Sequence, residues 1–66
     1  MTQFEPRVSA SGRYPIGQAA QILGVHRNTL RRYNDQGLIK SGNRRFGRME
    51  KFFLGSEILR FWRAHI

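Results

Sequence analysis

The sequence predicts a small, mainly α-helical domain that carries one β-hairpin. Its 66 residues can enclose one hydrophobic core and no more. Apolar residues recur at helical spacing in three stretches, and Gly24 and Gly37 stand where the first two stretches end. Between the second and third stretches, two short apolar runs flank a segment rich in Gly, Asn and Arg, a pattern typical of a hairpin.

Before the first helix, residues 1–13 mix Ser, Gly, Pro and charged residues without periodicity. This composition predicts a flexible N-terminal arm, so the folded domain is expected to span residues 14–66. Arg7 and Arg13 could reach a nucleic acid from the arm. Because the arm has neither an apolar run nor a basic start, we expect no signal peptide, no membrane span and a cytoplasmic location.

The first helix is expected to start at Pro15 and to stop at Gly24, residue types that suit those ends. Four apolar residues within it stand at i, i+3, i+4 and i+7, which places them on one stripe of a helix. The two alanines among them are small enough for a second helix to approach closely. The stripe consists of Ile16, Ala19, Ala20 and Leu23.

The second helix is expected over residues 27–36, with Gly37 at its C-terminal cap. At about 100° per residue its side chains divide between two faces. One face, with Thr29, Leu30 and Tyr33, is expected to join the core. The opposite face is polar and mostly basic, and holds Arg27, Asn28, Arg31, Arg32 and Asp35.

The hairpin is expected to pair residues 38–40 with residues 50–53. The loop between them carries Arg44, Arg45 and Arg48, with Asn and Gly beside them. A hairpin with so basic a tip is expected to lie as a wing against a phosphate backbone. A solvated loop without a partner is the alternative.

The last helix is expected to begin near Gly55 or Ser56, either of which can cap it. Its apolar residues spread over a broad arc and supply much of the remaining core, with Arg60 and Arg63 on the other side. Trp62 lies within that arc, which favours packing over base stacking for its side chain. The arc comprises Ile58, Leu59, Phe61, Trp62 and Ile66.

The charge of the chain indicates a polyanionic partner. Twelve Lys and Arg against four Asp and Glu give a formal net charge of +8. Most of these cations are arginines, which can bind a phosphate or a guanine edge with two hydrogen bonds. The chain has no cysteine, its two histidines are far apart and its acids are scattered. We therefore expect no enzyme activity, no metal and no cofactor.

Two short helices joined by a tight turn at Gly24 and Val25 make a helix-turn-helix, whose basic second helix fits the major groove of DNA, roughly 12 Å wide. Three side chains near the start of that helix are expected to read base edges: Arg27, Asn28 and Arg31. Six others are expected to contact phosphates: His26, Arg32, Arg44, Arg45, Arg48 and Lys51. For His26, capping the helix is the alternative role.

The stretch YPIGQAAQILGVHRNTLRRYNDQGLI, residues 14–39, resembles the opening of the MerR-type winged-helix domain. Residues 14–66 as a whole resemble the shorter, excisionase-like version of that domain. The resemblance implies a winged helix-turn-helix fold with the second helix in the major groove and the wing on the adjacent backbone or minor groove. It is carried by Tyr14, Ile16, Ala19-Ala20, Leu23-Gly24-Val25, Thr29-Leu30-Arg31, Tyr33 and Gly37-Leu38.

The chain departs from the family pattern at three positions. The family usually has Ser or Thr, which cap the second helix, where this chain has His26. A polar cap is common at the position of Leu54, and wings often carry an arginine at the position of Lys51. The resemblance is to the DNA-binding unit, and we expect no counterpart of the long dimerisation helix and effector domain of ligand-sensing MerR regulators.

The resemblance leaves two uses of DNA binding open. The first is an excisionase-like recombination directionality factor of a bacterial mobile element, which binds and shapes DNA for an integrase. The second is a small MerR-like transcription regulator at the nucleoid. One module of this size buries only roughly 600–1,000 Å², so cooperative self-association on DNA is expected in both cases. An RNA- or ribosome-binding role is less favoured because the aromatic residues mostly stand at core positions.

Overall fold

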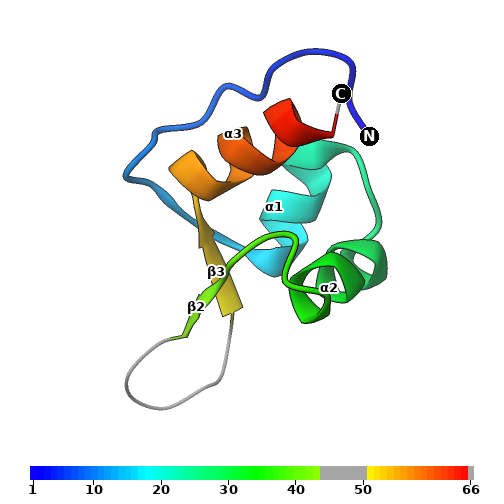
Figure 1. Ribbon diagram of the computed structural model, residues 1–66. Helices are drawn as coiled ribbons and strands as arrows, with labels where there is room; N and C mark the ends of the chain where they lie inside the picture. The colour runs from blue at the N-terminus through cyan, green and yellow to red at the C-terminus, as the bar shows by residue number, and fades with distance from the viewer. Residues whose placement is uncertain (44–50, 66) are drawn as a thin grey trace.

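The computed structural model describes residues 1–43 and 51–65 of the chain (Figure 1). The strands form one antiparallel sheet in the order β1-β3-β2, with α1 and α3 packed against it and α2 packed on α1. The predicted mainly helical domain with a β-hairpin is confirmed. In chain order the elements are β1 (Arg13–Pro15), α1 (Ile16–Leu23), α2 (Arg27–Asp35), β2 (Gly42–Asn43), β3 (Lys51–Leu54) and α3 (Gly55–Ala64).

Helices α1 and α2 are each closed by a glycine with a left-handed backbone, Gly24 directly after α1 and Gly37 two residues after α2. The φ angles of Gly24 and Gly37 are 73° and 78°, values that glycine adopts without the strain a Cβ would bring. At each end, the amides of the glycine and of the next residue donate to carbonyls of the last helical turn at 2.9–3.1 Å. Helix α1 ends where Gly24 predicts, whereas α2 is one residue shorter than expected, so that its C-cap is Gln36 and Gly37 is the residue after the cap.

One apolar cluster forms the core of the part of the chain that the structure describes. Helix α2 contributes a single fully buried residue to it, Leu30, beside the partly buried ring of Tyr33. The Tyr33 ring lies 5.3 Å from that of Phe61, so α2 also contacts α3. Trp62 is 7% exposed, which confirms its predicted place in the core. The cluster comprises Ala19, Ala20, Leu23, Leu30, Ile39, Phe53, Ile58, Phe61 and Trp62.

The strand predicted at residues 38–40 is wrong, since β2 lies further along the chain. The backbone of this segment is bonded to side chains instead of to a neighbouring strand. The Ile39 carbonyl accepts from Nδ2 of Asn34 at 2.8 Å, and the Lys40 amide donates to Oε1 of Glu57 at 3.2 Å. These side-chain partners compete with strand pairing and leave the segment irregular.

Strand β1 is absent from the sequence prediction, which places residues 1–13 in an arm and starts a helix at Pro15. In the structure Arg13 pairs with Leu54 and Tyr14 with Phe53, so β1 forms an edge of the sheet. Three residues that end in proline carry no alternating apolar pattern, and their partner strand lies near the other end of the chain. The strand depends on tertiary pairing that local sequence does not encode.

The N-terminal segment, residues 1–12, runs along α3 (Figure 1). The Thr2 amide donates to the Leu23 carbonyl at 2.8 Å, and the Thr2 carbonyl accepts from the Trp62 indole at 3.0 Å. Glu5 forms an ion pair with Arg63. Composition predicts a flexible arm here, whereas the structure gives this segment defined partners. All three partners lie at least 20 residues along the chain from the segment, at a range that its composition does not reveal.

The start of α3 is capped by this N-terminal segment. The N-cap residue is Leu54, which has no side-chain cap, and neither Gly55 nor Ser56 takes the capping role expected of them. Instead, the Gly55 amide donates to the Gly12 carbonyl at 2.9 Å and the Ser56 amide to the Ala10 carbonyl at 3.0 Å. Backbone carbonyls thus bond amides of the first turn that a polar cap would otherwise satisfy.

Candidate nucleic-acid interface

The outer face of α2 presents a row of polar side chains to solvent. On the inner face, Leu30 is fully buried while Thr29 and Tyr33 are partly buried. The division of the helix into a core face and a basic face is therefore confirmed. The exposed residues of the outer face are Arg27, Asn28, Arg31, Arg32 and Asp35.

The arginines of α2 differ from those of α3 in their partners. On α3, Arg60 pairs with Glu57 and Arg63 pairs with Glu5. Within residues 1–43 and 51–65, no ion pair joins an arginine of α2 to an acidic side chain. A guanidinium without an acidic partner has its N–H donors available for a phosphate or a base edge. The basic face of α2 is thus better suited to a polyanion than the arginines of α3 are.

His26 caps the start of α2. Its Nδ1 accepts from the Asn28 amide at 3.1 Å, the bond that Ser or Thr usually makes at an N-cap. Because Nδ1 accepts, the neutral ring carries its proton on Nε2, which can donate to a phosphate oxygen. Capping and phosphate contact are therefore compatible roles for this residue.

His26→Ala is expected to lower the free energy of unfolding by about 1 kcal/mol, since the Asn28 amide loses its acceptor. His26→Ser keeps an oxygen acceptor at the same position and should restore most of that loss. Urea unfolding of the two variants beside the parent chain measures the difference. Equal stability of the alanine and serine variants would contradict the cap.

Arg27 is directed differently from the other two predicted base readers. A Cβ placed on Gly17 would lie 3.3 Å from Nη2 of Arg27, so this guanidinium lies over the first turn of α1. Asn28 and Arg31 are exposed and lie on the same face, since residues three apart are neighbours on a helix. The structure therefore groups Asn28 with Arg31 and brings Arg27 to the helix start of α1.

Phe52 of β3 lies at the base of the hairpin, between β2 and β1. Phe52 pairs with Gly42 of β2 on one side and with Pro15 of β1 on the other. The Arg13 guanidinium lies 5.4 Å from the centroid of the ring, within the range of a cation–π contact. Lys51 pairs with Asn43 at the end of the described hairpin. The remaining predicted phosphate contacts, Arg44, Arg45 and Arg48, lie outside the described residues, as does Ile66 of the predicted apolar arc.

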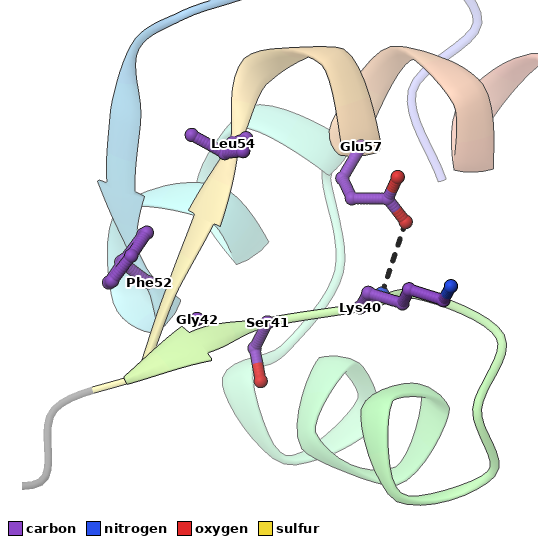
Figure 2. Close-up of a pocket in the computed structure, with 6 residues that line it drawn as sticks. All are labelled: Lys40, Ser41, Gly42, Phe52, Leu54 and Glu57. Atoms are coloured by element: carbon purple, nitrogen blue, oxygen red, sulfur yellow. Dashed lines mark hydrogen bonds between the residues drawn. The ribbon is translucent and has the colours of Figure 1, made fainter. Parts of the chain in front are cut away.

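Residues 38–41, here termed the linker, connect α2 to β2 and are held by α3. Oε1 of Glu57 accepts from the Lys40 amide at 3.2 Å, drawn as the dashed line in Figure 2, and from Nη2 of Arg60 at 2.5 Å. Hydrogen bonding from Arg60 lowers the pKa of the Glu57 carboxyl; burial opposes this and the Lys40 amide assists it. The carboxylate is therefore ionised at neutral pH.

An open groove of about 290 Å³ lies between the linker, the hairpin strands and the start of α3 (Figure 2). Across the described ranges, no three His, Asp or Glu side chains gather as a metal site would require. In the same ranges, no helix combines the length and apolar character needed to cross a bilayer. The groove is lined by Lys40, Ser41, Gly42, Phe52, Leu54 and Glu57.

Three residues that organise this surface have no role in the sequence prediction: Asn34, Glu57 and Arg60. Glu57 and Arg60 stand at i and i+3, a spacing that predicts their ion pair on a helix. Their bonds to the linker have no such signal, because Lys40 lies 17 residues away from Glu57. The oxygen of Asn34 also accepts from the Ser41 hydroxyl at 3.2 Å, so its amide spans the linker.

Comparison with protein families adds an independent result. The model of the MerR family regulatory proteins matches residues 15–48, which include α1, the turn, α2 and β2. This range covers just over half of the 66 residues. No curated protein and no solved structure gives a significant match.

Proposed function

The chain belongs to the MerR family of regulatory proteins, and on that basis we propose that it reads a specific sequence of double-stranded DNA with α2 in the major groove. The observation that carries the proposal is the outer face of α2. Its arginines are exposed and have no acidic partner within the described ranges. The opposite face of the helix is anchored in the core by Leu30. The resemblance of residues 14–39 to the MerR-type domain implies that the same helix enters the major groove.

The proposed roles divide the α2 side chains into two groups. Asn28 and Arg31 read base edges, since Asn can bond adenine and Arg can bond guanine through paired hydrogen bonds. Arg27 joins them as a reader, and its position over α1 also suits a phosphate near that helix start. The proposed phosphate contacts, which fix position without reading sequence, are His26, Arg32, Arg44, Arg45, Arg48 and Lys51.

Selection from a randomised duplex pool tests the proposal directly. The purified chain is mixed with the duplex pool or with a single-stranded RNA pool at low and at physiological salt, and the retained molecules are sequenced. Enrichment of a short duplex motif at both salt concentrations is the expected result. If both pools are retained without enrichment, and the retention is lost as salt rises, the chain binds polyanions only non-specifically and the proposal is wrong.

Arg31→Ala is expected to cost roughly 1–3 kcal/mol of discrimination at one base pair of the selected site, because one base-edge contact is lost. Arg32→Ala, one residue further along the same exposed face, should weaken binding to every DNA sequence by the same factor and leave base preference unchanged. Titrations against the selected site and its single-base variants measure both effects. If Arg31→Ala binds more weakly but keeps the same base preference, Arg31 does not read a base.

For the biological use of this binding, we propose an excisionase-like recombination directionality factor of a bacterial mobile element. The resemblance of residues 14–66 to the short excisionase-like domain supports this use. Neighbouring copies would bind adjacent sites cooperatively, bend the DNA and assist an integrase at the nucleoid. Selected sites in direct repeat that are bent when occupied, measured by fluorescence transfer between labelled DNA ends, are the expected result.

Transcription regulation is the second candidate, favoured by the match to a family of regulatory proteins. A regulator of this kind would bind sites within a promoter and change transcription from it without a recombinase. A reporter joined to the selected site separates the candidates. Control of the reporter with unbent DNA would favour regulation over recombination.

A further inference from the structure

Two side chains of α3 bind the backbone of the linker on either side of Ile39. Glu57 accepts from the Lys40 amide at 3.2 Å through Oε1. Arg60 donates to the Leu38 carbonyl through Nη2 at 3.5 Å. The two side chains also bind each other, since Nε of Arg60 lies 3.1 Å from Oε2 of Glu57 and its Nη2 lies 2.5 Å from Oε1. Together they form a clamp between α3 and the linker, here termed the α3 clamp.

The segment that the α3 clamp holds connects the two parts of the proposed DNA interface. The linker leaves α2 at one end and enters β2 at the other. It has no strand partner of its own, and between the two clamped residues the Ile39 side chain is fully buried. Figure 2 shows Glu57 reaching from α3 across the groove to the Lys40 amide. The path of the chain from α2 into the hairpin is therefore held by these bonds on the α3 side and by the Asn34 amide on the α2 side.

We infer that Glu57 and Arg60 are positioning residues of the DNA interface: they hold the linker against α3 and so fix the hairpin relative to α2. This inference rests on the proposed function, because it assigns the clamp a role in the same binding surface. Neither residue needs to touch DNA. Their effect on affinity passes through the placement of groups that do.

The negative charge of Glu57 makes the direction of the affinity change informative. By electrostatics alone, removing a carboxylate from a chain of net charge +8 should tighten its binding to DNA. If Glu57 positions the interface, its removal should weaken binding in spite of that gain in charge. The two accounts therefore predict opposite changes in affinity for one substitution.

The chain provides a matched control for this substitution. Glu5 also forms an ion pair with an arginine of α3, Arg63, but it belongs to the N-terminal segment and not to the linker contacts. Glu5→Ala and Glu57→Ala thus remove the same charge and the same kind of ion pair. Only the second removes a bond to the linker.

The experiment measures the affinity of both variants for the selected duplex at two salt concentrations, at a temperature where unfolding curves show every variant folded. Glu57→Ala should bind about fivefold more weakly than the parent chain, whereas Glu5→Ala should bind equally or more tightly. Arg60→Ala should also bind more weakly. Glu57→Gln, which keeps an oxygen acceptor for the Lys40 amide, should recover part of the loss. A Glu57→Ala variant that binds as tightly as Glu5→Ala would overturn the inference.

Hydrogen exchange of the Lys40 amide provides a readout that needs no DNA. Exchange should be faster in Glu57→Ala than in the parent chain, and unchanged in Glu5→Ala, because only the first removes the acceptor. Unchanged exchange in Glu57→Ala would overturn the clamp itself. If the parent chain enriches no duplex motif, the proposed function fails and the role in DNA binding fails with it. These outcomes are distinguishable, since slow Lys40 exchange is measured on the free protein.

Discussion

Leu30→Ala is expected to lower the free energy of unfolding by about 2–5 kcal/mol, through a cavity beneath α2. Leu30 is fully buried and is the one residue of α2 in the buried cluster of the described chain. A chain of 66 residues has a stability of roughly 3–10 kcal/mol, so the loss is a large part of the total. Urea unfolding monitored by the fluorescence of Trp62 measures it.

Arg31→Ala is the matched control for that substitution, because Arg31 is the next residue of the same helix and is exposed. It should change stability by less than about 0.5 kcal/mol while altering base preference. The pair thus separates the two faces of α2, one that carries stability and one that carries binding. A Leu30 variant as stable as the parent chain would show that α2 is turned differently about its axis.

The helices of this protein could be predicted from sequence because their signals are local. The apolar stripe from Ile16 to Leu23 and the glycines at positions 24 and 37 define α1, the turn and the end of α2. The same periodicity identifies which residues of α2 are exposed. Each of these features depends on residues within one or two helical turns of each other, which is the range that periodicity and capping rules cover.

The sheet and the linker could not be predicted because their bonds join distant residues. The pairing of β1 with β3 connects residues 13–15 with residues 52–54, and nothing in the short segment RYP indicates a strand. The segment 38–40 has the apolar residues of a strand, but Asn34 and Glu57 bond its backbone first. Strand propensity is a weak guide where side chains compete for the same groups.

The candidate site divides along the same line. The exposed row on α2 follows from helical geometry, and the basic residues in that row are enough to indicate a polyanionic partner. Glu57 and Arg60 hold the linker that follows α2, and the N-terminal segment bonds the start of α3, so these groups act from the far end of the chain or from its start. Sequence thus reveals the groups that would touch DNA more readily than those that support them.

Gly55→Ala is expected to lower the free energy of unfolding by about 3 kcal/mol, because the N-terminal segment leaves no room for a side chain at this position. A Cβ at Gly55 would lie 1.8 Å from the carbonyl oxygen of Ser9 and 2.7 Å from its carbonyl carbon. Both neighbours are backbone atoms, which cannot rotate away as a flexible side chain can. The segment must therefore move off the start of α3.

Helix propensity alone predicts the opposite change, since alanine favours a helix over glycine by about 1 kcal/mol. A loss of stability would thus show that the packing of the N-terminal segment outweighs the preference of the helix. Ser56→Ala, at the next and exposed position, is the control and should have little effect, because the Ser56 bond to Ala10 is made by its backbone amide.

Hydrogen exchange of the Ser56 amide identifies the cause of the loss. In Gly55→Ala this amide should exchange faster than in the parent chain, since displacing the segment removes the Ala10 carbonyl from it. A variant that is more stable than the parent chain, with the Ser56 amide still protected, would mean that the segment does not approach Gly55 so closely. In that case α3 would have to obtain its cap from another group, and the N-terminal segment would return to the flexible arm that composition predicts.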